Sequence, residues 1–240
     1  LDFDSDGQLV ASVLSKKIAA GSTHVLIDMP VGPTAKVRSE AAAHSLGSRL
    51  AHTAAALGLQ LGIHRSDGTQ PVGRGIGPAL EAHDVLKVLR NAADAPADLR
   101  ERALALSAAL LDMAPGSNAG TGLERARSVL DSGRALAKFL AICEAQGGFR
   151  EPARAPFTAD VPASASGRIT EIDNRRLAKL AKLAGAPTSP TAGLETSLRV
   201  GDAVERGQPL LTLHAESPGE LAYALEHAAT LQPFVLGEVP

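Results

Sequence analysis

The chain has 240 residues, of which 45% are hydrophobic and 21% charged, and its formal net charge is -2 at pH 7. This length allows one large domain or two modest ones, each with its own core. A chain without a basic excess is not expected to bind nucleic acid. It also has no apolar run near the roughly 18 residues that span a bilayer. Because Cys143 is the single cysteine, a disulfide framework and a cysteine metal cluster are excluded, and we expect a cytoplasmic protein.

The first predicted element is an amphipathic helix over residues 6–21. Ser5 and Gln8 have the spacing of a capping box, and the glycine at the end of this segment is a typical stop. Leucine, valine and isoleucine side chains take one face of the helix. Ser12 and Lys16 gather on another face, because positions four residues apart differ by about 40° around a helix.

The next three elements are a strand, a helix and a strand. Residues 24–29 (HVLIDM) form a short apolar run that suits a buried strand, residues 37–57 read as a helix, and residues 59–64 (LQLGIH) read as a second strand. The order helix, strand, helix, strand implies a parallel or mixed sheet covered by helices, which is an α/β fold.

A glycine-rich segment, SDGTQPVGRGIGP at residues 66–78, follows the second strand. Its GxGxG spacing matches neither the dinucleotide-binding fingerprint nor a Walker loop, so we expect its glycines to allow tight turns. A helix is predicted from Ala79, and a helix-dominated run then reaches about residue 146. These helices are expected to cover the sheet.

The composition changes at GGFREPARAPF, where two glycines and two prolines indicate a linker. We therefore predict an α/β domain over residues 1–147, a linker over 148–156 and a smaller α+β domain over 157–240. In the last of these, GDAVERGQPLLTL is typical of a tight turn between two short strands. This piece resembles the half-motif of lipoyl-like barrel-sandwich modules, although no lysine stands at its tip.

Four blocks of the sequence carry a family resemblance. Residues 4–37 (DSDGQLVASVLSKKIAAGSTHVLIDMPVGPTAKV) and 66–86 (SDGTQPVGRGIGPALEAHDVL) resemble the thymidine and pyrimidine-nucleoside phosphorylases, in particular the long branch that includes AMP phosphorylases. Residues 166–187 and 199–216 resemble the C-terminal domain of that family. The resemblance covers essentially the whole chain.

The resemblance also implies that part of the active site is missing. The family's phosphate-gripping segment, a KxSTGG-like stretch, lies upstream of the helix that opens this chain, and nothing here matches it. Residue 1 is Leu, and no signal-peptide pattern follows it. We therefore expect a C-terminal fragment of a longer protein.

The chemistry of this family needs a group that stabilises a departing base. In phosphorolysis, phosphate attacks C1′ while the bond to the base nitrogen breaks, and the base gains negative charge that cations, hydrogen-bond donors or a proton donor can stabilise. The resemblance implies that Ser12 and Lys16 bind the base. Asp4 matches the acid that AMP phosphorylases are thought to use as proton donor, and Lys36 matches a lysine that contacts the nucleotide there. The catalytic residues would then be Asp4 and Lys16.

Each of these residues also has a structural interpretation. Ser12 and Lys16 could be the solvated face of an amphipathic helix, Asp4 could be an acidic residue that interacts favourably with a helix N-terminus, and Lys36 could be an ordinary exposed lysine between a strand and a helix.

The resemblance further implies a monovalent-cation site and a homodimer. Aligned with the pyrimidine branch, Val72, Gly75 and Asp84 would supply cation ligands, with the remaining ligands upstream. Phosphate is a co-substrate of the reaction, and no cofactor besides the monovalent cation is expected. The leading activity is phosphorolysis of thymidine. Phosphorolysis of AMP and a non-catalytic binding module are the alternatives.

Overall fold

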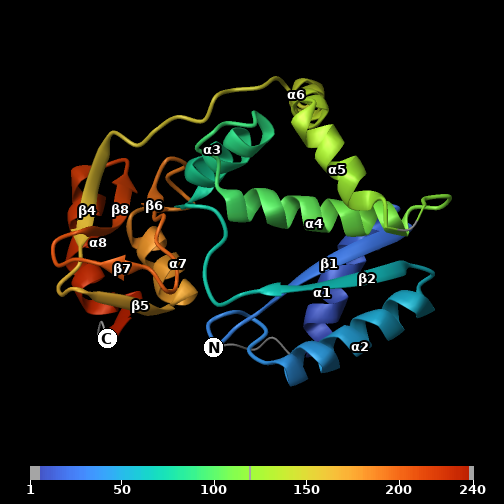
Figure 1. Ribbon diagram of the computed structural model, residues 1–240, viewed down its shortest axis with the longest axis horizontal. Coiled ribbons are helices and arrows are strands. Elements are labelled where there is room, and N and C mark those ends of the chain that lie inside the picture. The colour runs from blue at the N-terminus through green and yellow to red at the C-terminus, as the bar shows by residue number, and fades with distance from the viewer. Residues whose placement is uncertain (1–5, 119, 238–240) are drawn as a thin grey trace. The chain divides into compact units, whose positions relative to one another are not determined.

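The computed structural model describes residues 6–118 and 120–237 (Figure 1). The helices are α1 (Asp6–Ala19), α2 (Glu40–Ala56), α3 (Pro78–Leu89), α4 (Ala97–Met113), α5 (Gly122–Asp131), α6 (Arg134–Ala145), α7 (Asn174–Leu183) and α8 (Pro218–Leu231). The strands are β1 (His24–Val31), β2 (Gln60–Asp67), β3 (Gly75–Ile76), β4 (Phe157–Pro162), β5 (Gly167–Ile172), β6 (Gly193–Glu195), β7 (Ala203–Val204), β8 (Pro209–Ala215) and β9 (Phe234–Gly237). None of the helices in these two described ranges combines the length and apolar character needed to cross a lipid bilayer.

The chain folds into two compact units. The first contains the chain up to Gly68 together with Arg102–Val129, and the second contains Thr69–Glu101 and the chain from Leu130 onward. The division therefore passes through α4, whose first residues belong to the second unit.

The first unit is built on the parallel pair β1–β2, in which His24 lies opposite Gln60 and Val31 opposite Asp67. In Figure 1, α2 runs along one side of this pair. Residues with apolar side chains form the core between the strands and helices α1 and α2. The buried members are Val10, Leu14, Val25, Met29, Ala43, Leu46, Leu50, Ala54 and Leu59. The helix, strand, helix, strand order expected from the sequence is confirmed, as is the α/β class.

The start of the second helix differs from the sequence-based expectation. The second helix begins at Glu40, three residues later than predicted, because the Ser39 side chain accepts the N–H of Ala42 at 3.2 Å and caps the helix there. Val37, predicted as its first residue, instead forms an isolated parallel bridge with Val31.

The second unit contains two antiparallel sheets. One has the strand order β3-β6-β8-β4 and the other β7-β5-β9. Between β7 and β8 the predicted tight turn is present, with the N–H of Gln208 donating to the carbonyl of Glu205 at 3.0 Å and with a φ of 88° at Gly207. The two strands that flank this turn lie in different sheets.

These units do not coincide with the two sequence-predicted domains. Residues 69–101 and 130–147, expected in the first domain, belong to the second unit. One reason is β3, which the glycine-rich segment contributes to the C-terminal sheet, with Gly75 opposite Glu195. Sequence reasoning interpreted that segment as turns only.

Candidate functional site

The predicted base-binding residues lie on the outer face of α1. Val10 and Leu14 point into the core, with exposed fractions of 6% and 1%. Because Ser12 and Lys16 lie on the other side of the helix, both are exposed. The structure thus presents a hydroxyl and an ammonium group on one accessible helix face. Their binding of a base stays a prediction.

Asp4, the predicted proton donor, lies outside the described residues. Lys36 is exposed on the loop between β1 and α2. This loop is closed at its base, because the N–H of Gly32 donates to the carbonyl of Val37 at 3.0 Å. Lys36 therefore follows the carboxyl end of a parallel strand, which is where open α/β sheets usually bind ligands.

Gly68 packs against this loop from the end of β2. Its N–H donates to the carbonyl of Val31 at 2.9 Å. A Cβ atom at position 68 would lie 3.0 Å from the Cβ of Ala35 and 3.0 Å from the backbone nitrogen of Val31. Only a glycine lets the chain after β2 approach the loop this closely without displacing it.

A polar cluster that sequence reasoning missed joins the C-terminal half of β1 to the carboxyl end of β2. The Arg102 guanidinium, from the part of α4 in the same unit, donates to the Asp28 carboxylate at 3.0 Å, to the Ser66 hydroxyl at 2.8 Å and to the Asp67 carbonyl at 2.9 Å. The Ser66 hydroxyl also donates to Asp28 at 2.6 Å. Asp28 was the one signal for this cluster in the sequence, because it is a charged residue inside a mostly apolar strand.

In the second unit, Asp84 of the predicted cation site binds the glycine-rich segment that contains the other two predicted residues. Its side chain is buried, and one carboxylate oxygen accepts the N–H of Arg74 at 2.6 Å and the N–H of Gly75 at 2.8 Å. Val72 belongs to the same glycine-rich segment. These contacts give Asp84 a structural role in fixing the segment, and cation binding by Val72, Gly75 and Asp84 stays a prediction. Within the described part of the chain, no group of three or more His, Cys, Asp and Glu side chains could hold a metal ion.

A buried histidine lies beside a carboxylate elsewhere in the second unit. His214 on β8 has an exposed fraction of 7%, and its Nε2 lies 3.5 Å from a carboxylate oxygen of Glu195 on β6. The His214 side chain holds the pKa of the Glu195 carboxyl below its ordinary value, against an opposing effect of burial. Neither residue belongs to the predicted site.

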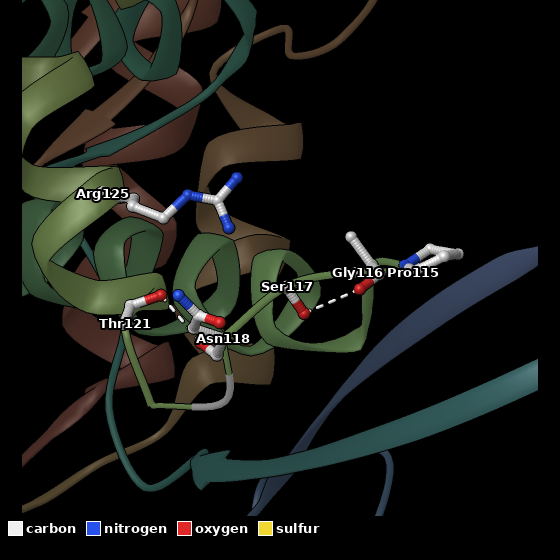
Figure 2. A pocket seen from close by; sticks show the side chains of 7 residues that line it. Pro115, Gly116, Ser117, Asn118, Thr121 and Arg125 are labelled. Carbon is white, nitrogen blue, oxygen red and sulfur yellow. Dashed lines mark hydrogen bonds between the residues drawn. The ribbon is translucent and has the colours of Figure 1, made fainter.

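Two hollows lie in the first unit. One, of about 480 Å³, is lined by α1 and α2 residues that do not include Ser12 or Lys16. The other, of about 300 Å³, lies at the loop before α5 (Figure 2). There the Ser117 hydroxyl donates to the Ala114 carbonyl, the Thr121 hydroxyl donates to the Asn118 carbonyl, and the first amide of α5 donates to Asp112. Because these polar groups already have partners within the loop or on α4, we assign the hollow no binding role.

Comparison with known proteins supports a common origin for the whole chain. Residues 168–233 match the family model of the pyrimidine nucleoside phosphorylase C-terminal domain. "Putative thymidine phosphorylase 2" of Acidovorax sp. (strain JS42) is 62% identical over 233 residues, which are 97% of this chain and 45% of that protein. "Putative thymidine phosphorylase" of Polaromonas sp. (strain JS666 / ATCC BAA-500) is 61% identical over 230 residues, 96% of this chain and 45% of that protein. The corresponding protein of Hahella chejuensis (strain KCTC 2396) is 58% identical over 226 residues, 94% of this chain and 45% of its own length.

The chain thus spans less than half the length of these curated relatives. Its α/β fold and these matches place it among the nucleoside phosphorylases. The chain belongs to the thymidine and pyrimidine-nucleoside phosphorylase family, as the sequence resemblance predicted.

Proposed function

We propose that the complete polypeptide containing these residues catalyses phosphorolysis of thymidine, giving thymine and 2-deoxyribose 1-phosphate. The observation that carries this proposal is the 62% identity over 97% of the chain to the relative named "Putative thymidine phosphorylase 2". We further expect a cytoplasmic homodimer that takes phosphate as co-substrate and has a monovalent cation at Val72, Gly75 and Asp84.

In the proposed reaction, a phosphate oxygen forms a bond to C1′ while the bond from C1′ to the base nitrogen breaks and its electron pair leaves with the base. The Lys16 ammonium and the Ser12 hydroxyl then stabilise the negative charge on the departing base. Both side chains are exposed on one face of α1 and so are accessible to a substrate. Because the family's phosphate-gripping segment is not among the 240 residues, we expect these residues alone to give no turnover.

Phosphorolysis of AMP, giving adenine and ribose 1,5-bisphosphate, is the second candidate. It is favoured by the position of Lys36, an exposed cation at the carboxyl end of β1, where the phosphate group of a nucleotide could be bound. In this reaction Asp4 would donate a proton to the departing adenine.

Substrate preference can be measured directly with the complete polypeptide. The protein is incubated with thymidine, uridine or AMP, each with and without phosphate, and the released base is separated by chromatography. Phosphate-dependent release of thymine is the expected result. Release of adenine from AMP with thymidine left intact would replace the thymidine proposal with the AMP reaction. Binding of a base analogue with no turnover of any substrate would favour a non-catalytic module.

A further inference from the structure

We propose that Arg102 is a positioning residue for Lys36, and this inference rests on the second candidate function, phosphorolysis of AMP, in which Lys36 binds the substrate. The hydrogen bonds that Arg102 makes to Asp28, Ser66 and Asp67 do not include Lys36. Instead it fixes the end of β2, against which the loop that carries Lys36 is packed.

The first step is the anchoring of the strand ends by the guanidinium group. Arg102 donates to the side chains of Asp28 on β1 and Ser66 on β2 and to the backbone carbonyl of Asp67. The Arg102 side chain has an exposed fraction of 18% and that of Asp28 27%, so the ion pair is largely shielded from water. One planar group thus joins the C-terminal half of β1, at Asp28, to the end of β2, at Ser66 and Asp67. A lysine with its single nitrogen could not do so with the same geometry.

The second step leads from the strand end to the loop. Gly68 directly follows Asp67, whose carbonyl Arg102 holds. The Gly68 N–H donates to the Val31 carbonyl, and its Cα lies so close to Ala35 that an added Cβ would be 3.0 Å from the Ala35 Cβ. Ala35 is the neighbour of Lys36. A shift of the chain at Asp67 and Gly68 must therefore move the loop that presents the Lys36 ammonium.

Substitution of Arg102 should consequently change substrate binding more than the chemical step. The test uses the complete polypeptide with AMP and phosphate as substrates. Arg102→Gln should raise KM roughly tenfold and change kcat less than threefold, because a misplaced binding group weakens substrate binding without entering the reaction. Arg102→Lys keeps the positive charge and loses the planar guanidinium group. It should give a KM between those of the wild type and Arg102→Gln.

A double-mutant cycle separates positioning from a general effect on folding. If Arg102 acts through Lys36, adding Arg102→Gln to Lys36→Ala should raise KM no further. Arg100→Gln is the matched control, since Arg100 lies on the same helix and pairs with a carboxylate, that of Asp131, away from the strand ends. Its KM should equal that of the wild type. Additive effects of the Arg102 and Lys36 substitutions would overturn the proposal.

Hydrogen exchange gives a second readout that does not need activity. Arg102→Gln should accelerate amide exchange over residues 31–37 and at Gly68, and Arg100→Gln should leave it unchanged. Unchanged exchange in Arg102→Gln would overturn the proposal even if the wild type proved to have no phosphorolysis activity. In that case, accelerated exchange would support the anchoring of the loop, while the proposed function alone would fail.

Discussion

Asp84 and Gly75 are joined by a buried hydrogen bond, in which the backbone N–H of Gly75 donates to the Asp84 carboxylate at 2.8 Å. The same oxygen accepts the N–H of Arg74 at 2.6 Å. A helix side chain therefore holds the glycine-rich segment in the conformation that lets β3 pair with β6. Because both donors point at one carboxylate, its removal leaves two amides without their partner.

Replacing Asp84 by alanine should destabilise the protein strongly. Each buried amide left unpaired costs about 1–3 kcal/mol, so Asp84→Ala should lower the free energy of unfolding by about 2–6 kcal/mol in urea denaturation. Asp94→Ala is the control, since this exposed carboxylate pairs with Lys87 on the surface and its loss should leave the free energy of unfolding nearly unchanged. Equal stability of the two variants would mean that Asp84 does not fix the segment.

Gly193 should tolerate no side chain. Its φ is 150°, and an added Cβ would lie 2.1 Å from the Ile76 carbonyl oxygen, across the β3–β6 pair. Gly193→Ala should therefore separate these strands and cost more than about 3 kcal/mol. At Gly201, where φ is 99° and no atom lies within 4 Å of an added Cβ, the same substitution should cost only about 1–2 kcal/mol of backbone strain. Thermal unfolding of both variants measures the difference.

Acidification should lower the folding stability of the protein through protonation of Glu195. The His214 side chain lowers the pKa of this carboxyl from its ordinary value of 4.5. A carboxyl with a lower pKa in the folded state stabilises the fold above its unfolded-state pKa, and this contribution is lost as the pH falls through the folded-state pKa. Glu195→Gln should thus be less stable than the wild type at pH 7, with a difference that shrinks below about pH 4.5. A difference that grows on acidification would contradict the assignment.

The elements with clear periodicity were predictable from the sequence, and the two-residue strand β3 was not. The separation of α1 into a buried face and the face that carries Ser12 and Lys16 follows from the 3.6-residue period. β3 has only two residues and pairs with β6 across more than a hundred positions. No local pattern signals such a pairing, because its stability comes from contacts distant in the sequence.

The residues of the candidate site were also predictable only in part. Lys36 was found because it lies in a block that resembles the family. Arg102 was missed because it reads as one of several charged residues on a helix, and its partner Asp28 is 74 positions away. Only the fold brings the two together.

The central claim is that the Lys16 ammonium stabilises the departing base, and the most direct test is the activity of Lys16→Ala in the complete polypeptide. We expect kcat/KM for phosphate-dependent base release to fall by about 10²–10³-fold, with the unfolding temperature unchanged because Lys16 is exposed. Lys17→Ala, at the neighbouring position of α1, should retain nearly full activity. A Lys16→Ala protein as active as the Lys17→Ala protein would contradict the account.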